Sequence, residues 1–351
     1  MCSTSTGNKN TQDKADDGIY PFYVRSQTVE RINSWTFDGE AILTAGDGVG
    51  VGKVFHHTYG KIGVHQRVYI LSDFKCDANY LFHFFSSKFY NRVKRMSAKN
   101  SVDSVRKEMI TDMPLSLPCH QEQVKIGYML SLLDERIATQ NKIIEDLKKL
   151  KSAISKQLFA QKPNEWNRLD TLFSKGKAGG TPTSTNKEYY NGEVPFLSIN
   201  DITKQGKYVR YTENHLSRSG LANSSAWVVP EYSLIMSMYA SVGLVTINEI
   251  PITTSQAMFA MQLKEKDLLD YLYYYLSYFK YRHIHKYLET GTQSNINADI
   301  VRGIMIPTYG HSRNMEIAST LQRIDAKIDN ELAVLELFNR QKRYLLSQMF
   351  I

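Results

Sequence analysis

The segment GDGVGVGK, from Gly46 to Lys53, has the composition of a loop that holds phosphate with backbone N–H groups. A P-loop would require glycine where the chain has Asp47, and a hydroxyl side chain where it has Val54. The dinucleotide-binding pattern also fails, because its third glycine would fall on Val51. The spacing favours a glycine-rich turn between two strands, and a nucleotide-binding enzyme is the alternative.

Other residue types that could do chemistry form no catalytic or metal-binding pattern. An amino-methyltransferase would carry N-P-P-[YF] or D-P-P-[YF], yet none of the nine prolines is next to another. The nine histidines form no H-E-x-x-H motif. The cysteines at positions 2, 76 and 119 have neither metal-ligand spacing nor an obvious disulfide arrangement. We therefore expect no catalytic residue and no metal site.

Composition and charge indicate a cytoplasmic protein with an anionic partner. A chain of 351 residues with 42% hydrophobic residues predicts at least two domains. No apolar run approaches the length of a membrane span, and the polar N-terminus does not resemble a secretory signal. The net charge of +8 and the pI of about 9.1 hint at a polyanion, a weak indication by itself.

An internal repeat organises the chain. The segments 132–159 and 323–350 are similar, and Gln157 matches Gln348 at a shift of 348 − 157 = 191 residues. At the same shift Gly52 falls on Gly243, in a copy that keeps one glycine of GDGVGVGK and no lysine. The shared feature is therefore interpreted as a turn. We predict globular halves at 1–118 and 162–308, and long helices at 119–161 and 309–351.

Both long segments carry apolar residues at alternating spacings of four and three, which is typical of a coiled-coil seam. Polar residues interrupt both seams at the same places, whereas two unrelated amphipathic helices would share no such interruptions. We expect an antiparallel helix pair, each helix roughly 60 Å long. The seam positions are Ile126, Leu130, Leu133, Ile137, Gln140, Ile144, Leu147, Lys151, Ile154 and Leu158, and then Ile317, Leu321, Ile324, Ile328, Glu331, Leu335, Phe338, Lys342, Leu345 and Met349.

Each globular half combines short β-like runs with one aromatic-rich helical stretch. The β-like runs begin at residues 40, 66, 231 and 257, and the helical stretches cover 79–96 and 268–288. A polar loop follows each stretch, and then a strand that ends at Pro118 or Pro307. The fold class is predicted as α+β. It comprises two tandem-repeated domains, each with a small twisted sheet, separated by two antiparallel coiled-coil helices about a pseudo-two-fold.

This arrangement resembles the specificity subunit of type I restriction–modification systems. The two-fold repeat carries the resemblance, together with the helix endings KQLF and SQMF. So do WNRLDTLFSKGKAGGTPTS from Trp166, GTQSNIN from Gly291, and the stretch from Phe37 to Leu71, which looks like a target-recognition domain. The resemblance covers nearly the whole chain.

The resemblance implies a non-catalytic subunit in which each globular half recognises one half of a bipartite, asymmetric site in double-stranded DNA. It implies that the helices hold the spacing and dock two methyltransferase subunits, with restriction subunits in the full complex. The assembled complex would be an adenine-type DNA methyltransferase and ATP-dependent endonuclease. S-adenosylmethionine, ATP and Mg would belong to the partner subunits, so this chain is expected to hold no cofactor. A membrane partner is not expected.

One departure concerns the start of the first half. The second half opens with WNRLDTLF, whereas the first begins almost at the equivalent of the following loop, with Gly7 matched to Gly176. We therefore expect the first half to be N-terminally shortened and to lack an edge strand or helix.

Candidate DNA-reading residues are the polar residues in turns that differ between the halves. Arg pairs readily with guanine and Asn or Gln with adenine, and basic side chains contact phosphates. The candidates are Arg25, Gln27, Lys53, His56, His57, Lys61, His65 and Arg67 in the first half, and Lys175, Lys177, Thr181, Thr183, Asn200, Lys204, Tyr239, Ser241, Gln293 and Asn295 in the second.

A coiled-coil adaptor that joins two protein partners without reading DNA is the main alternative. It shares the helices but requires no phosphate contacts. The sequence supplies no residue-by-residue code, so no DNA target follows from it.

Overall fold

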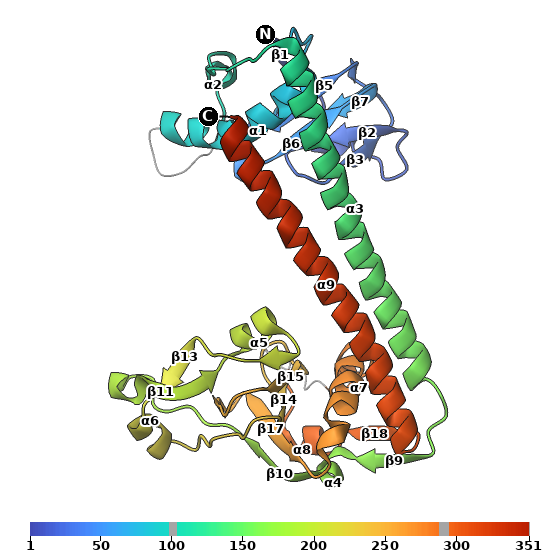
Figure 1. Ribbon diagram of the computed structural model, residues 1–351, viewed down its shortest axis with the longest axis vertical. Helices are drawn as coiled ribbons and strands as arrows, with labels where there is room; N and C mark the ends of the chain where they lie inside the picture. Colours follow the sequence, from blue (N-terminus) through green and yellow to red (C-terminus); the bar gives the residue numbers. More distant parts are fainter. Residues whose placement is uncertain (98–103, 288–294, 351) are drawn as a thin grey trace. The chain divides into compact units, whose positions relative to one another are not determined.

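A computed structural model describes residues 1–97, 104–287 and 295–350 (Figure 1). Tertiary contacts divide the chain into two units: unit 1 comprises 1–143 and 331–351, and unit 2 comprises 144–330. Each unit therefore contains one globular part and a portion of both long helices. The division predicted from the sequence instead placed the boundaries at the ends of the helices. Within the described ranges no helix is both long and apolar enough to cross a membrane.

The two long helices are α3 (His120–Phe159) and α9 (His311–Met349). All twenty seam positions are buried or half-buried, as the four-three spacing predicts. Inside unit 1 the Gln140 amide donates to the Glu331 carbonyl at 3.0 Å, and Lys342 pairs with Asp134, so the helices run antiparallel. The polar residues that interrupt the seams thus bond across the helix pair.

Unit 1 contains two four-stranded sheets, with strand orders β1-β8-β5-β6 and β3-β2-β7-β4. Helix α1 begins where the Asp77 carboxylate accepts a hydrogen bond from the Tyr80 N–H at 2.7 Å. The elements are β1 (Ser3–Thr6), β2 (Tyr20–Tyr23), β3 (Glu30–Ile32), β4 (Phe37–Asp38), β5 (Ala41–Ala45), β6 (Phe55–Thr58), β7 (Lys61–Val64), β8 (Val68–Ser72), α1 (Ala78–Met96) and α2 (Lys107–Thr111).

Unit 2 contains sheets of order β10-β17-β14-β15-β12 and β13-β11-β16, and the pair β18-β9. The elements are β9 (Glu165–Arg168), α4 (Leu169–Leu172), β10 (Phe173–Ala178), β11 (Tyr190–Leu197), α5 (Ile199–Gln205), β12 (Tyr208–Val209), β13 (Asn214–Leu216), α6 (Arg218–Ala222), β14 (Leu234–Ser237), β15 (Val245–Asn248), β16 (Thr253–Thr254), β17 (Met258–Leu263), α7 (Leu269–Arg282), α8 (Ala298–Arg302) and β18 (Met305–Thr308).

The repeat is confirmed in three dimensions. Helices α1, α2 and α3 begin 191 residues before α7, α8 and α9, respectively. The sheet order β1-β8-β5-β6 recurs as β10-β17-β14-β15, and β3-β2-β7 recurs as β13-β11-β16. Gly52 and Gly243 both have positive φ, 65° and 78°, which glycine adopts without strain. The segment GDGVGVGK therefore contains the turn that the sequence predicts.

Three details of the sequence prediction are wrong. Each half has two main sheets rather than one small sheet, because β2 and β7 pair in parallel and start a second layer. Gly7 corresponds to Gly179 rather than Gly176: each directly follows its strand and donates at 3.1 Å, to the Val68 and Met258 carbonyls, respectively. Within the described stretch 104–118 no strand ends at Pro118, although β18 ends one residue after Pro307.

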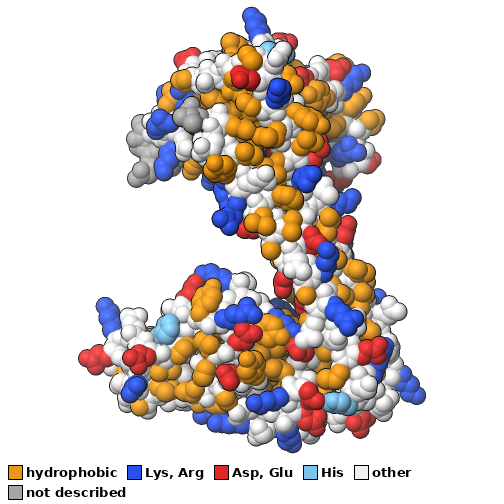
Figure 2. Space-filling model, viewed as in Figure 1, with side chains coloured by type: hydrophobic (Ala, Val, Ile, Leu, Met, Phe, Trp, Pro, Cys, Tyr) orange, Lys and Arg blue, Asp and Glu red, His pale blue; other side chains and the backbone are white. Residues whose placement is uncertain are grey.

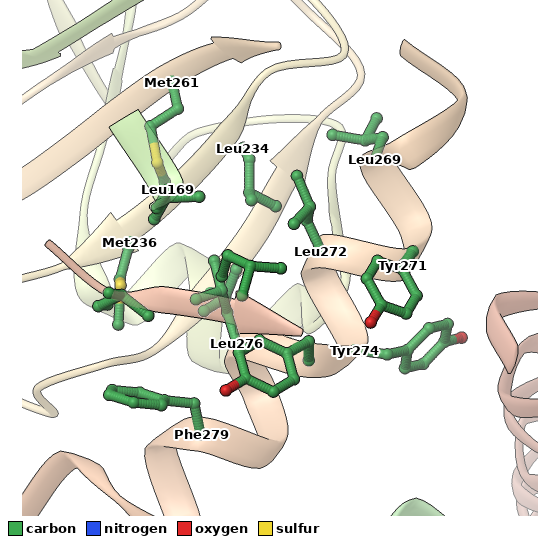
Figure 3. Close-up of a cluster of buried hydrophobic side chains, with 14 of the residues drawn as sticks. Leu169, Leu234, Met236, Met261, Leu269, Tyr271, Leu272, Tyr274, Leu276 and Phe279 are labelled. Atoms are coloured by element: carbon green, nitrogen blue, oxygen red, sulfur yellow. The ribbon is translucent and has the colours of Figure 1, made fainter. Parts of the chain in front are cut away.

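Each unit has its own hydrophobic cores. The largest cluster lies in unit 2, where α7 packs on the sheet strands and on Leu169, the first residue of α4 (Figure 3). Leu169, Leu234, Leu272 and Leu276 lie within it (Figure 3). The corresponding cluster of unit 1 is built around α1 and α2. Burial of this apolar surface is the main stabilising contribution to each half.

Candidate nucleic-acid interface

A polar concavity of about 540 Å³ lies on unit 1 where four loops meet. The loops follow β1, β2, β5 and β7. Sequence segments more than fifty residues apart are thus brought together by the sheet register. The lining residues are Asn10, Thr11, Gln12, Arg25, Asp47, His65, Gln66 and Arg67.

Two arginines among the candidates from the sequence line this concavity and share one carboxylate partner. Arg25 Nη1 lies 2.9 Å from Asp47 Oδ1, and Arg67 Nε lies 3.7 Å from Asp47 Oδ2. Both side chains are substantially exposed, 46% and 65%, so their remaining N–H groups face solvent. A guanidinium held at one end by a carboxylate presents a fixed pair of donors, which suits a phosphate or a guanine edge.

Amide side chains that are not among the sequence candidates lie beside these arginines. Gln66 Nε2 donates to Asn10 Oδ1 at 2.6 Å, and Gln12 is exposed on the same loop. Amide side chains pair with adenine, as arginine pairs with guanine. These residues therefore suit contacts with base edges, like the neighbouring arginines. Gln66 stands directly between two predicted residues, His65 and Arg67, and that position is the signal by which the sequence could have identified it.

His65 lines the concavity but is only 5% exposed. Its Nε2 lies 3.3 Å from Thr11 Oγ1, and its Nδ1 accepts a hydrogen bond from the Arg67 N–H at 3.0 Å. Burial lowers the pKa of His65, which keeps the ring neutral and able to accept that bond. We interpret His65 as a positioning residue that fixes the Arg67 backbone.

The other predicted residues of the first half lie outside the concavity lining. Gln27 is exposed, and His56 Nε2 lies 3.2 Å from the Ser26 carbonyl, in the connection after β2. The remaining three make contacts within unit 1: Lys53 lies over the Tyr90 ring at 5.5 Å, His57 Nε2 lies 2.9 Å from Glu40, and Lys61 lies over the Trp35 ring at 5.1 Å.

An equivalent corner exists in unit 2. The Gly46 N–H bonds to the Arg67 carbonyl at 2.8 Å, and the Met238 N–H bonds to the Ala257 carbonyl at 2.7 Å. Thr181, a predicted residue, donates from its hydroxyl to Gln256 at this corner. Gln256 corresponds to Gln66 and is likewise not among the sequence candidates. The two halves thus present an exposed glutamine at the same place in the fold.

The other predicted residues of unit 2 fall into separate groups. Ala240 and Ser241 adopt positive φ, 41° and 35°, in the loop after β14, and such strain is common at binding sites. Gln293 lies outside the described residues. Lys175 lies 4.2 Å from the Trp227 ring, and Lys177 contacts the Ser225 carbonyl. Asn200 and Lys204 both contact Glu213. Thr183 and Tyr239 are exposed, and Asn295 is half-buried.

In each unit, the polar seam residues connect the helix pair to the globular part. In unit 2, Lys151 pairs with Asp325 at 2.5 Å, and Asp325 accepts a hydrogen bond from the Tyr274 hydroxyl at 2.8 Å. In unit 1, the residues at the same shift of 191 make the same chain: Lys342 pairs with Asp134, whose carboxylate lies 3.8 Å from His83 Nδ1. This network fixes the position of α1 or α7 on the helix pair.

His83 is expected to make unit 1 sensitive to acid. Burial, opposed by Asp134 and reinforced by Lys342, lowers the pKa of His83 from 6.5 to about 4. Between these values the unfolded chain binds a proton that the folded chain excludes, so stability falls as the pH drops from 6.5 towards 4. His83→Tyr introduces the residue that unit 2 has at the equivalent position, Tyr274. We expect this variant to lessen the fall in Tm between pH 7 and pH 4.5 by roughly 5 °C.

The matched control is His120→Tyr, at an exposed histidine of the same unit. Thermal unfolding followed by circular dichroism at both pH values measures the effect. Equal acid sensitivity of the His83→Tyr variant and the wild type would contradict the assignment.

One exposed cluster of the described residues has metal-ligand types. Glu265, Asp267 and His311 place their ligand atoms within 4.8 Å of one another, and His311 Nε2 lies 3.2 Å from Asp267 Oδ2. All three side chains are exposed, and the ion pair already accounts for their approach. Exposed acidic groups commonly lie this close together without a metal ion.

The duplicated fold with a polar corner on each half can be compared with known proteins. The family profile described as "Type I restriction modification DNA specificity domain" matches residues 2–149 and 163–337. The chain belongs to this family. The two matches correspond to the two copies of the repeat, each with the greater part of one long helix.

Curated relatives agree with the family assignment. The chain is 26% identical over 208 residues to the EcoDI type I specificity subunit of Escherichia coli, covering 57% of this chain and 45% of the relative. It is 24% identical over 195 residues to the MjaIX specificity subunit of Methanocaldococcus jannaschii, covering 54% and 44%. The chain thus spans less than half the length of these relatives.

Solved structures share the fold. The type I system S subunit from M. genitalium superposes with a TM-score of 0.66 at 15% identity, covering 100% of this chain and 94% of that chain. A second structure, from work on assembly and conformational transition of the type I R–M system, gives 0.57 at 16% identity, covering 92% and 83%. This family fold confirms the predicted class of two tandem α+β domains with long helices.

Proposed function

We propose that the chain is the DNA sequence-recognition subunit of a type I restriction–modification complex. Each globular half reads one half of a bipartite, asymmetric site in double-stranded DNA, and the long helices set the spacing. The observation that carries the proposal is the duplicated corner, where unit 1 gathers two arginines and several amides in one concavity. Family membership and the net charge of +8 support it.

We also propose that the helices dock two methyltransferase subunits. A helix pair that were only a spacer would expose polar residues, yet hydrophobic side chains gather on the surface of unit 1 (Figure 2). We call the large hydrophobic residues that these helix portions expose the docking face. It comprises Val124, Tyr128, Met129, Leu132 and Ile143 of α3, and Leu332, Val334, Leu337 and Tyr344 of α9.

Catalysis and cofactors are assigned to the partners in this proposal. The complex would methylate adenine and cleave DNA with ATP, through methyltransferase and restriction subunits that carry S-adenosylmethionine, ATP and Mg. The absence of methyltransferase motifs from the sequence supports a non-catalytic role for this chain. We place the complex in the cytoplasm, in keeping with the scattered cysteines.

The two arginines of the concavity provide a direct test. In the assembled complex, Arg25→Ala with Arg67→Ala is expected to weaken binding to the cognate duplex about tenfold or more. If both contact phosphates, the slope of log K against log salt becomes shallower by about 2. Fluorescence anisotropy across a salt series measures both quantities.

The control is Arg31→Ala with Arg95→Ala, which removes the same charge from exposed residues outside the concavity. Equal losses of DNA affinity in the two double variants would mean that the concavity contributes only positive charge and no specific contact. A complex with no salt-dependent affinity for DNA would instead favour the coiled-coil adaptor.

A further inference from the structure

The two halves differ in charge at the equivalent corner. In unit 1 this corner holds Arg25, Asp47 and Arg67, joined by the ion pairs described above. Their counterparts in unit 2 can be identified because the same backbone bonds recur in both folds. All three counterparts are uncharged: Ile199 for Arg25, Tyr239 for Asp47 and Ala257 for Arg67.

The backbone alone gives this correspondence. Arg67 and Ala257 accept the equivalent hydrogen bonds that define the corner. Asp47 and Tyr239 each directly follow the residue that donates this bond. The members of the remaining pair each lie two residues after a strand that pairs in parallel, β2 with β7 in unit 1 and β11 with β16 in unit 2. The charged side chains of unit 1 are thus replaced position by position.

One polar side chain is retained at the corner, Gln66 in unit 1 and Gln256 in unit 2, and both are exposed. Gln66 donates to Asn10, and Gln256 accepts a hydrogen bond from the Thr181 hydroxyl. Each glutamine is therefore held by a side chain from the loop that follows an edge strand, β1 or β10. In unit 2 the glutamine keeps this support although the neighbouring charges are replaced.

Two glycines place Thr181 beside Gln256. A Cβ atom at Gly179 would overlap the carbonyl oxygen of Thr254, and the Gly180 N–H donates to the same carbonyl at 2.9 Å. The chain after β10 can therefore lie directly against the backbone at the end of β16. This close approach brings the Thr181 hydroxyl within reach of the glutamine amide.

A glutamine amide held in this way matches adenine. Glutamine pairs with adenine by donating to N7 and accepting from the N6 amino group. The Gln256 Oε1 atom has two lone pairs, so it can accept from Thr181 and from the base, while its amide N–H groups remain free to donate. Arginine, the usual partner of guanine, is replaced by Ile199 and Ala257 at this corner.

We propose that Gln256, supported by Thr181, reads an A·T base pair in the block recognised by unit 2, through contacts that carry no charge. Unit 1 uses arginines at the same place in the fold, so the two halves read their blocks with different chemistry. The inference rests on the proposed function and names the base pair that is read at the second corner.

The test uses the assembled complex and fluorescence anisotropy. One duplex carries the methylated motif of the host, and the others replace each base pair of the block assigned to unit 2 in turn. Gln256→Ala is expected to bind the motif duplex about tenfold more weakly and to lose discrimination at one A·T pair alone. The slope of log K against log salt stays unchanged, because no phosphate contact is lost.

The matched control is Gln161→Ala, at an exposed glutamine of unit 2 outside the corner, which is expected to bind as the wild type does. The proposal is overturned if Gln256→Ala keeps its discrimination at every A·T pair, if it loses discrimination at a G·C pair, or if its salt slope becomes shallower by about 1. A wild-type complex that does not distinguish the motif from the replaced duplexes would instead contradict the proposed function itself.

Discussion

Exchanging residues 166–307 for the same region of a relative with a different target is expected to change one block of the methylated DNA motif and leave the other block intact. The buried clusters of unit 2 draw only on residues 154–324, so the second globular part has its own core. Each mismatched base pair costs about 1–3 kcal/mol of binding free energy, so several mismatches in the old block together abolish methylation at the old site. Methylated-base sequencing of the host reads both blocks at once.

The reciprocal exchange of residues 1–118 is the matched control and should change the other block alone. The relative must be chosen with apolar residues that match Phe159, Ile317 and Leu321, which pack against the exchanged region. Changes in both blocks after either exchange would contradict independent reading by the two halves.

Leu130→Asp is expected to unfold unit 1 and to release the proposed methyltransferase partner. Leu130 lies on α3 and is fully buried against α1 and the C-terminal end of the chain. It packs there in one cluster with Tyr80, Phe84 and Phe350. An unpaired carboxylate there costs about 4 kcal/mol or more, a large fraction of the stability of a domain. Thermal unfolding and co-purification with the partner measure the two losses.

Leu132→Asp is the control, two residues along the same helix. Leu132 is 40% exposed and belongs to the docking face. Its replacement should change stability by only about 0.5 kcal/mol while weakening the partner's binding. If Leu132→Asp leaves co-purification unchanged, the docking face lies elsewhere; if Leu130→Asp leaves unfolding unchanged, the seam is wrongly placed.

The helices are the most predictable part of the fold, because their signal is local and repeated. The four-three spacing predicts every seam position, and the shift of 191 relates the first residues of α3 and α9, His120 and His311. The prediction of a strand ending at Pro118 is wrong because a strand requires a partner. The sequence of residues 114–117 resembles that of β18 in apolar content, yet of these two described segments only β18 is paired.

The candidate interface is predictable in residue type but less so in position. Arg25 and Arg67 stand out in the sequence as polar residues in variable turns, but their convergence on Asp47 depends on strand pairings between distant segments. His65 meets the same criterion, although both of its ring nitrogens are engaged in the folded protein. Gln66 and Gln256 become comparable only once the two halves are superposed by their hydrogen bonds.

The most direct test is methylated-base sequencing of a host that carries this gene with the methyltransferase of the same system, compared with the same host lacking this gene alone. We predict a motif, dependent on this gene, of two different short blocks separated by an unspecified gap. A methylation pattern that does not change when the gene is removed would contradict the claim that this chain reads the DNA.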